Sequence, residues 1–565
     1  MQVILLIGSI LSVSCLTWNE PELEKWRKKA ESMFYMAYSN YLEHAYPKDE
    51  LKPISGTGHN TYGGVRLSLV DALDTLAVLG NASEFRRIAK EVESTLSFDA
   101  DINVSVFETN IRIVGGLISA HLLYKRMGMH PLPQGWPCAG PLLDKALDIG
   151  NILLSAFNTP TGLPYGTVNL RSRRVPPKET PVTCTACAGT YLVEFITLSR
   201  LSGDTRFEEA AKRAVNALWR SRSSIDLVGN HINISSGVYV YTDSTIGMGI
   251  DSYFEYLVKG AAMTGSSQYR EMFDQYLSAI NKHLRKDDWH IWATYSKGHA
   301  TLPYFNSLEA FWPGLLALHG DLESAKRSFY NYFSIWKQYG FIPEFYNIEL
   351  QKAVDSRAGY PLRPELVESA VYLYQATSDP FYLDAGAQML HSLLHSAVVT
   401  NGFAHISRIT DHAVEDRMES FFLAETAKYL YLLFYPDHFL FQPLATTHTL
   451  SNGHQCLLDT GFYVFNTEAH VVDVSALYCC SESPQKYTFN NFNSKEHFRK
   501  VFQSTPITYP SQYHIFYHNN TCQCTLHSEP VLGQDDVLSF DIEKNSCGSL
   551  EYFSSYLVGG NFVID

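Results

Sequence analysis

Apolar and charged helical segments alternate along most of the chain. A strongly apolar segment such as LSLVDALDTLAVLG is followed by a Gly-containing turn and then by a more charged segment, here NASEFRRIAKEVESTL. Seven apolar segments of this kind recur, mostly at intervals of roughly 55 to 80 residues, which is typical of a helical-repeat architecture. The alternation predicts an inner layer of apolar helices and an outer layer of amphipathic ones. The last apolar segment, RMESFFLAETAKYLYLLF, has no charged segment after it.

Seven inner helices can stack as an open solenoid or close into a ring, and the repeat alone leaves both arrangements open. We favour a ring because the connections before the apolar helices are long and rich in Gly, Pro and aromatic residues. Loops of this kind often carry binding residues, and in a ring they would gather at one mouth. Several apolar helices begin with an acid, so a ring would place these carboxylates round one rim.

The two ends of the chain differ from this repeat. The apolar run from Val3 to about Val13 predicts a secretory signal peptide over residues 1–15, with cleavage near Cys15. Residues 19–45 read as one amphipathic helix, and the predicted barrel covers 16–475. From about Asp473 the periodicity ends, and residues 476–565 are interpreted as a loosely ordered, cysteine-bearing extension.

Several features predict passage through the secretory pathway. Four N-x-S/T sequons are candidate glycosylation sites: Asn81, Asn103, Asn233 and Asn519. No stretch after the signal reaches the roughly 20 apolar residues of a membrane span. The final residues, GGNFVID, contain no KDEL-type signal, so either residence in a lumen would need a partner or the protein is secreted.

The composition narrows the class of partner. A net charge of -14 argues against nucleic acid, because phosphate binding needs clustered Lys and Arg. An apolar fraction of 45% suffices for a large core. The chain is also rich in aromatic residues, with 35 Tyr, 32 Phe and 8 Trp. Aromatic faces suit sugar rings, although such residues more often fill cores.

The cysteines suggest a covalent partner. Ten are present, and nine remain if Cys15 leaves with the signal peptide, so complete pairing leaves one over. The odd thiol favours a mixed disulfide with a thioredoxin-like oxidoreductase, and the alternative is a buried free cysteine. The candidates lie in the extension: Cys522, Cys524 and Cys547. The C-x-x-C pair Cys184 and Cys187 is interpreted as a structural disulfide or as buried thiols, because no thioredoxin-like strand pattern surrounds it.

Four acids form the candidate catalytic set. Glu108 opens FETNIR, Asp251 opens DSYFEYLVKG, Glu344 lies in FIPEFYN, and Glu365 lies at a helix start in LRPELVES. Carboxylates gathered in one cavity repel, so some of their pKa values should be raised. A raised acid beside an ionised base is what glycoside hydrolysis needs, and a separation of roughly 6.5 to 9.5 Å would imply inversion. Taken alone, each acid is more often a helix cap or a salt-bridge partner, so the interpretation depends on their joint occurrence.

The segment VFETNIRIVGGLISAHLL holds the most information. Glu108 and Arg112 are four residues apart and share one face of a helix. The adjacent Gly115 and Gly116 each cost roughly 1 kcal/mol of helix propensity, so we expect another backbone or a ligand to pack closely there.

So many core carboxylates predict a cation. Arg112, Arg363 and Lys259 neutralise part of the charge, but further acids lie near helix starts: Glu368, Glu419, Glu425 and Glu468. Calcium takes six to eight oxygen ligands, including hydroxyl, carbonyl and water oxygen. The segment FNTEAH at 465–470 offers the Thr467 hydroxyl and carbonyl with Glu468 beside them.

Five motifs resemble the family 47 glycoside hydrolases, the class I α-1,2-mannosidases. They are FETNIRIVGG, DSYFEYLVKG, LRPELVESAVYLY, RMESFFLAETAKYLYLLF and FNTEAH, and the similarity runs from about Lys25 to Ala476. Within the family, SLEAFWPG, GFIPEFYNI, LVGNHI and the pair Cys479-Cys480 look most like the ER degradation-enhancing group. The resemblance implies an all-α, (α/α)7 barrel of seven inner and outer helix pairs.

The resemblance also implies residue roles. Glu108 would be the general acid and Glu365 the general base, with Asp251 and Glu344 as further catalytic carboxylates; which acid delivers the proton directly stays open. Thr467 would bind calcium directly, and Glu368, Glu419 and Glu468 would hold calcium-bound waters. The implied substrate-binding residues are Arg112, Arg363, Glu368 and Glu419.

The chain departs from the processing mannosidases at three places. Ser307 and Ala310 stand where those enzymes carry a His and a Cys, and Gly249 stands where they carry an Arg. These changes leave the carboxylates intact but put the preferred glycan branch in question.

The implied function is an inverting, calcium-dependent exo-α-1,2-mannosidase of the endoplasmic reticulum lumen. It would trim high-mannose N-glycans on misfolded glycoproteins for ER-associated degradation. The alternative is a receptor in the same pathway that binds these glycans without cleaving them. The intact set of acids favours the enzyme, because a receptor needs no general base.

Overall fold

The computed structural model describes residues 18–450 and 453–480, and the backbone of one short strand pair, β24 (Val531–Leu532) with β25 (Leu538–Ser539). The expected signal peptide lies outside the described residues. So do Asn519 and the three candidate cysteines of the extension.

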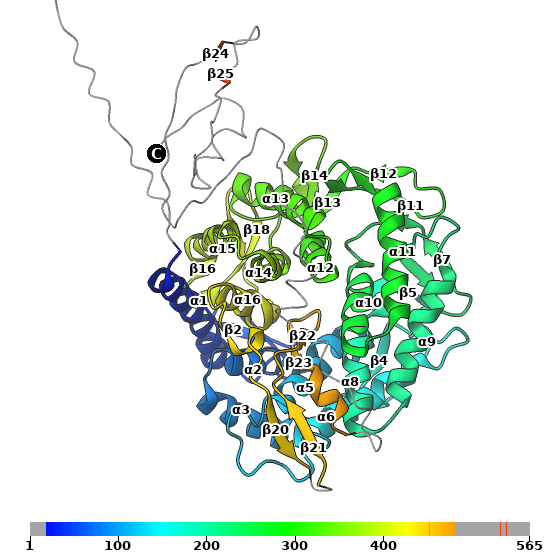
Figure 1. Ribbon diagram of the computed structural model, residues 1–565, viewed down its shortest axis with the longest axis vertical. Helices are drawn as coiled ribbons and strands as arrows, with labels where there is room; N and C mark the ends of the chain where they lie inside the picture. The colour runs from blue at the N-terminus through cyan, green and yellow to red at the C-terminus, as the bar shows by residue number, and fades with distance from the viewer. Residues whose placement is uncertain (1–17, 451–452, 481–530, 533–537, 540–565) are drawn as a thin grey trace, which may run out of the picture.

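Two concentric rings of helices make up the described part of the chain (Figure 1). The inner helices are α2 (Leu67–Val78); the continuous segment α4 (Val106–Glu108), η2 (Thr109–Val114) and α5 (Gly115–Leu122); α7 (Thr185–Gly189) with α8 (Leu192–Ser202); α10 (Asp251–Thr264); η4 (Ser307–Phe311) with α12 (Trp312–His319); α14 (Glu365–Thr377); and η7 (Phe422–Thr426) with α16 (Ala427–Leu433). The outer helices are α1 (Glu20–Asn40), α3 (Ala82–Thr95), α6 (Pro141–Leu154), α9 (Arg206–Ser221), α11 (Ser267–His283), α13 (Leu322–Tyr339) and α15 (Phe381–Ser392).

The inner ring is closed. Each inner helix contacts the next one along the chain, and η7, at the end of the series, contacts α2. Helix α1 packs against α16, so it is the outer partner of the last apolar helix. The predicted (α/α)7 barrel is therefore confirmed, and the ring is the correct alternative.

The two layers follow from their residue patterns. Every residue of α2 is buried, as an inner helix surrounded on all sides requires. Helix α9 buries one stripe instead, with Phe207, Ala210, Ala211, Ala214 and Leu218 at helical spacing. The charged remainder of α9 faces solvent, which is typical of the outer layer.

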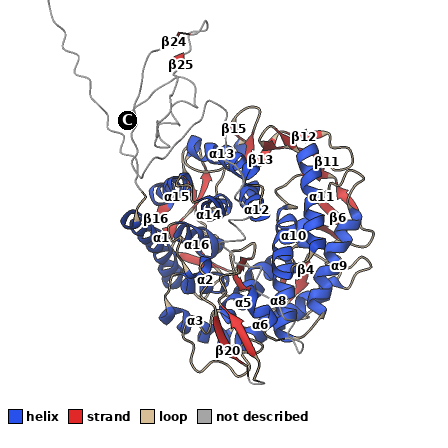
Figure 2. Cartoon of the chain, viewed as in Figure 1, coloured by secondary structure: helices blue, strands red, loops and turns tan. Residues whose placement is uncertain are grey.

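Short antiparallel strands occupy the connections of the barrel (Figure 2). Many of them precede inner helices and therefore lie at the rim where those helices begin. The pairings are β1 (Glu50–Lys52) with β2 (Thr57–His59); β3 (Asn103–Ser105) with β4 (Thr167–Asn169); β5 (Val182–Cys184), β6 (His231–Asn233) and β7 (Val238–Tyr241); β8 (Asp243–Ser244), β11 (Trp292–Thr294) and β12 (Ala300–Leu302); β9 (Arg285–Lys286) with β10 (Trp289–His290); β13 (Tyr304–Asn306), β14 (Phe345–Asn347) and β15 (Lys352–Ala353); β16 (Val398–Val399) with β17 (Gly402–Phe403); and β18 (His405–Arg408) with β19 (Ala413–Glu415).

The hairpin of β22 (Tyr463–Phe465) and β23 (Val471–Asp473) lies inside the ring (Figure 1). Its turn, residues 466–470, contacts five inner helices. The contacts include Asn466 with Glu194 on α8, Asn466 with Lys259 on α10, Ala469 with Lys428 on α16, and His470 with Asp71 and Asp74 on α2. The fifth is α5, where Gly115 faces Asn466. The hairpin therefore delivers its turn to the barrel axis.

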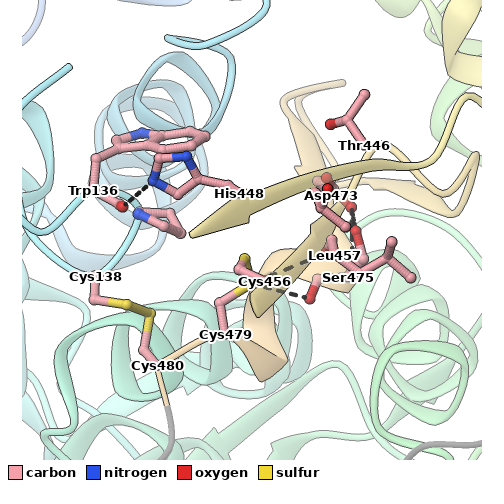
Figure 3. The surroundings of a disulfide bond; sticks show 12 residues. Trp136, Cys138, Thr446, His448, Cys456, Leu457, Asp473, Ser475, Cys479 and Cys480 are labelled. Atoms are coloured by element: carbon pink, nitrogen blue, oxygen red, sulfur yellow. Dashed lines mark hydrogen bonds between the residues drawn. A yellow bond between two sulfur atoms is a disulfide. The ribbon is translucent and has the colours of Figure 1, made fainter. Parts of the chain in front are cut away.

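The end of the barrel is tied down by two disulfides (Figure 3). Cys456 of β21 (Gln455–Leu458), which pairs with β20 (Thr446–Thr449), is bonded to Cys479, and Cys480 is bonded to Cys138. Helix η9 (Val474–Tyr478) leads into this pair. These two disulfides thus bind residues 479 and 480, the last of the described barrel, to β21 and to the segment before α6.

Candidate active site

Three of the four candidate acids lie where inner helices begin. Asp251 and Glu365 are the first residues of α10 and α14, and Glu108 closes the single turn α4. Glu344 lies immediately before β14 and reaches the same rim through the loop between α13 and α14. Since inner and outer helices alternate in direction, the starts of the inner helices meet at one mouth.

Arg363 joins two of these acids. Its guanidinium donates to both carboxylate oxygens of Glu344, at 2.7 and 3.1 Å, and its Nη1 lies 3.7 Å from Glu365 Oε1. The Ser307 hydroxyl also donates to Glu344, at 2.9 Å. Burial alone would raise the pKa of Glu344, but the Arg363 charge and these hydrogen bonds outweigh it and lower the pKa. Glu344 is therefore held as a carboxylate.

Asp251 and Glu365 are the opposite case. Burial, aided by repulsion from Glu255 and Glu365, raises the pKa of Asp251 to about 7. Burial also raises the pKa of Glu365 to about 7, although the Arg363 charge opposes it. One mouth thus contains a fixed carboxylate and two acids that exchange protons near neutral pH, as general acid–base chemistry requires.

Arg112 organises the other side of the mouth. It donates to Glu108 Oε2 at 2.8 Å and to the Ser420 hydroxyl at 3.1 Å, and its Nη2 lies 3.2 Å from Glu468 Oε1. The Phe421 ring connects the two sides, since its centroid lies 5.4 Å from the Arg112 guanidinium and 5.9 Å from that of Arg363. Glu108 therefore belongs to the same cluster as the other three acids.

The turn at 466–470 is fixed against α5 by Asn466. The Asn466 amide donates to the Ile111 carbonyl at 2.7 Å and to Glu194 at 2.8 Å. Its side-chain oxygen accepts the N–H groups of Glu468 and His470. A Cβ on Gly115 would lie 2.5 Å from the side-chain atom Nδ2 of Asn466, in the 466–470 turn. The expected close approach of another backbone is found at Gly116, where a Cβ would lie 3.1 Å from the Val70 carbonyl oxygen.

A group of buried acids surrounds this turn. Burial raises the pKa values of Glu368 and Glu468 to about 8, and burial with repulsion from Glu468 and Glu365 raises the pKa of Glu425 well above its ordinary value. Lys259 offsets part of the charge through an ion pair with Glu255 and a 3.8 Å approach to Glu368. Acids that are kept neutral by burial and by repulsion from one another would ionise beside a cation.

The candidate calcium ligands belong to this group. Thr467 is half-buried on the turn, and its N–H donates to the Tyr256 hydroxyl at 3.3 Å. Within the described residues, one oxygen each of Glu468 and Glu419 is buried without a hydrogen-bond partner. In that same part of the chain, no group of three or more His, Cys, Asp or Glu side chains is arranged to bind a metal directly. The donors thus fit a cation held by Thr467 and through water.

Glu419 completes the set of predicted substrate-binding residues. It pairs with His405 and Arg417, each at 3.2 Å, and the next residue is Ser420, which accepts from Arg112. All predicted catalytic, substrate-binding and metal-binding residues therefore connect to one cluster.

Other residues of the site were not singled out from the sequence. Asp71 and Asp74 lie on the fully buried α2 beside His470, and Glu194 and Tyr256 bind one another and hold the turn. Acids in so apolar a segment as LSLVDALDTLAV were a usable signal, because a buried charge needs a partner. Tyr256 gave no signal, because a tyrosine in an apolar helix looks like core.

Three of the four sequons lie among the described residues. Asn103 is exposed on β3, whereas Asn81 and Asn233 are half-buried. Asn81 accepts the Glu84 N–H as the cap of α3, and Asn233 accepts the N–H groups of Ser235 and Ser236 in a turn. No helix among the described residues is long and apolar enough to cross a membrane.

The chain belongs to glycosyl hydrolase family 47, whose family model matches residues 33–474. It is 52% identical to mouse ER degradation-enhancing alpha-mannosidase-like protein 2 over 461 residues, covering 81% of this chain and 80% of the mouse protein. The human protein of that name is 50% identical, with 87% and 86% covered. Arabidopsis alpha-mannosidase I MNS4 is 42% identical, with 80% and 70% covered.

A solved structure agrees with the fold. The α-1,2-mannosidase from Trichoderma reesei superposes with a TM-score of 0.70 at 25% identity, covering 80% of this chain and 99% of that enzyme. The resemblance found in the five motifs is therefore confirmed.

Proposed function

We propose that this protein is an inverting, calcium-dependent exo-α-1,2-mannosidase that trims high-mannose N-glycans on misfolded glycoproteins. The observation that carries the proposal is the contrast at one mouth between Glu344, fixed as a carboxylate by Arg363, and Asp251 and Glu365, whose pKa values lie at about 7. Family membership and the names of the relatives support the same reaction class.

The residues divide the chemistry as follows. Glu365 acts as the general base that takes a proton from water, since a base with a pKa near 7 has proton affinity and remains available at neutral pH. Glu108, oriented by Arg112, serves as the general acid on the side of the leaving oxygen. Asp251 supplies a further carboxyl near Glu365, with a pKa of about 7. Glu344 stays ionised because Arg363 donates to it, and this ion pair keeps the Arg363 guanidinium beside Glu365.

Calcium fits the donor set at the 466–470 turn. Thr467 would bind the ion directly, and Glu468, Glu368 and Glu419 would hold its waters, with unpartnered oxygens already present on Glu468 and Glu419. When bound, the ion would coordinate hydroxyls of the terminal mannose and help to distort its ring. Arg112, Arg363, Glu368 and Glu419 would contact the sugar.

The test is mannose release from Man9GlcNAc2 and from denatured glycoprotein by the purified full chain, with any disulfide-linked partner retained. We expect release that stops with EDTA, returns with calcium, and is lost in Glu108→Gln and Glu365→Gln. Proton NMR of the first product should show β-mannose, as inversion demands. Calcium-dependent glycan binding without any release would instead identify a receptor.

The cellular setting is part of the proposal. We place the protein in the lumen of the endoplasmic reticulum, because its mouse and human relatives are named for ER degradation and the chain carries N-x-S/T sequons. A thioredoxin-like oxidoreductase bound through Cys522, Cys524 or Cys547 would retain it there. Non-reducing gels of the three Cys→Ser variants test this, and a high-mass band that survives all three substitutions counts against the partner.

A further inference from the structure

The C-x-x-C pair is a disulfide that the proposed hydrolysis does not use. Cys184 ends β5 and Cys187 lies in α7, and the two sulfurs are bonded. The bond spans only three positions of sequence, whereas Cys138–Cys480 spans 342. Cross-links stabilise mainly by restricting the unfolded chain, and a short loop leaves little to restrict. Global stabilisation is therefore a much smaller part of what this bond contributes than it is for Cys138–Cys480.

The disulfide lies at the edge of an exposed apolar face. Cys184 pairs with His231, and His231 pairs with Tyr241, so the three side chains project from the same side of the sheet β5–β6–β7. On that side Tyr241 is 62% and Val238 58% exposed. The row between them, Thr183, Ile232 and Tyr239, is buried on the opposite side.

The same short turn supports the segment that carries Asp251. Thr185 and Ala186, the two residues between the cysteines, donate their N–H groups to the carbonyls of Asn230 and Gly249, both at 2.9 Å. Asn230 in turn donates its side-chain amide to the Met248 carbonyl at 2.7 Å.

The far end of α7 makes a second contact with this segment. The hydroxyls of Thr190 and Ser252 are 2.8 Å apart, and the Ser252 N–H donates to Asp251 Oδ1 at 2.8 Å. The C-x-x-C turn thus contacts the chain on both sides of a candidate catalytic acid.

We propose that Cys184–Cys187 is a thiol–disulfide exchange site for a protein dithiol, and that its opening changes the support of Asp251. Val238 and Tyr241, both exposed on the side of the sheet that carries Cys184, favour a partner that presents apolar surface round its cysteine over a small charged thiol such as glutathione. The coupling to Asp251 rests on the proposed function, whereas the exchange itself does not.

The exchange conserves atoms and electrons. A partner thiolate attacks the Cys187 sulfur, forms a mixed disulfide, and releases Cys184 as a thiolate. The Cys184 sulfur already accepts the Cys187 N–H at 2.9 Å, which stabilises that leaving group. The second thiol of the partner then attacks the mixed disulfide and releases Cys187. Two electrons and two protons pass from the partner dithiol to the cysteine pair, and the partner becomes a disulfide.

The experiment uses the full chain, treated with endoglycosidase because Asn233 faces the same side of the sheet. Reduced thioredoxin, or glutathione at equal thiol concentration, is added, and free thiols are alkylated and mapped by peptide mass spectrometry. With thioredoxin we expect Cys184–Cys187 to open at least tenfold faster than Cys138–Cys480. Thioredoxin whose second active-site cysteine is Ser should be trapped on Cys187. Equal rates for the two disulfides would overturn the exchange site.

Surface variants test the class of partner. The double variant Val238→Ser, Tyr241→Ser should slow the thioredoxin reaction about fivefold and leave the glutathione reaction unchanged. The matched control is Leu350→Ser, which removes an equally exposed apolar side chain from another loop. If the double variant changes neither reaction, or both alike, the protein partner is the wrong class.

A separate readout tests the coupling. In the variant Cys184→Ala, Cys187→Ala we expect kcat for mannose release to fall about threefold, with KM little changed. We also expect the dependence of kcat on pH to shift relative to the parent protein. Unchanged kcat and pH profile would overturn the coupling. Exchange at Cys187 in a protein that releases no mannose would instead refute the proposed function and leave the exchange site standing.

Discussion

At the scale of single residues, burial decides the charge of Asp251. Its carboxyl accepts the Ser252 N–H and lies 3.5 Å from the Ser252 hydroxyl. The charges of Glu255 and Glu365 repel it, and the charge of Arg363 attracts it. Its pKa of about 7 exceeds the ordinary Asp value of about 3.9, so the folded state binds this proton more tightly than the unfolded state does.

The first prediction concerns stability against pH. Below pH 4 Asp251 is protonated in both states. As the pH rises toward 7 the unfolded chain ionises first, so stability is lost, by about 4 kcal/mol once the folded pKa is passed. Asp251→Asn should therefore stabilise the protein at pH 8 relative to the parent and lose this advantage at pH 4, as measured by denaturant unfolding. Asp101→Asn, on the surface, is the control, and an equal advantage at both pH values contradicts the argument.

The second prediction concerns the two hydrogen bonds that Arg363 donates to Glu344. Arg363→Lys keeps the charge but cannot make both hydrogen bonds to Glu344 while approaching Glu365. We expect kcat/KM for mannose release to fall by roughly 10- to 100-fold, since charge-assisted bidentate bonds are strong. The pKa of Glu344 should rise, which moves the acidic limb of the pH–rate profile upward. Arg171→Lys, in an exposed ion pair with Asp99, should change neither quantity.

The sequence located the candidate acids and the arginines that pair with them, but not the aromatic residues that surround them. Glu108, Asp251 and Glu365 were detectable because an acid at the head of an apolar helix stands out against its surroundings. Phe421 and Tyr256 were not, because an aromatic side chain in an apolar segment is normally core. The distance between any two of the acids depends on the closure of the ring, which residue patterns do not determine.

At the scale of elements, the paired glycines of the α4–η2–α5 segment decide how the 466–470 turn packs against this helix. Gly115 faces Asn466 and His470, and Gly116 faces Val70 and His470. The π-helical turn η2 lies directly before them and carries Arg112. One inner helix thus positions Arg112 toward Glu108 and Glu468 and also leaves room for the turn that holds Thr467.

The third prediction follows from this packing. Gly115→Ala would place a Cβ 2.5 Å from Asn466 Nδ2 and 3.0 Å from His470 Cδ2, so the turn must shift. We expect the protein to lose about 1–3 kcal/mol of stability, the usual cost of overpacking, and to need more calcium for half-maximal mannose release. Gly166→Ala is the control, because nothing lies within 4 Å of the added methyl. A calcium titration unchanged from the parent would contradict the proposed seat of the ion.

The helices were predictable and the strands were not. Each inner helix has an apolar run long enough to show its period, and each outer helix has a clear stripe. The rim strands are mostly two or three residues long, such as β14 and β8, so alternation has no room to appear. Their pairing depends on the ring that brings the connections together.

At the scale of the whole molecule, the ring is closed by partners from opposite ends of the sequence. The seventh apolar segment lacked a following charged helix because α1, at the start of the barrel, covers it. Trp18 and Trp26 stack on Phe434 at 5.7 and 5.9 Å, and the Arg27 guanidinium lies 4.3 Å from the Tyr435 ring. The repeat count gives the number of helix pairs. The contacts show that α1, the first helix in the sequence, is the outer partner of α16, the last inner helix.

The fourth prediction concerns the two kinds of disulfide. Cys138–Cys480 closes a loop of several hundred residues, for which chain-entropy reasoning gives about 6 kcal/mol, whereas the four-residue loop of Cys184–Cys187 gives about 2 kcal/mol. Replacing Cys138 and Cys480 by Ser should therefore lower the unfolding midpoint clearly more than replacing Cys184 and Cys187.

Calorimetry of both double variants under non-reducing conditions checks this order. Limited proteolysis should also show earlier cleavage between η9 and the barrel in the Cys138→Ser, Cys480→Ser protein, because β21 would then hold the last described residues through Cys456–Cys479 alone. Equal midpoints for the two variants would mean that contacts of η9, such as the Tyr478 hydroxyl on the Met263 carbonyl at 2.8 Å, suffice to fasten the end of the barrel without the long disulfide.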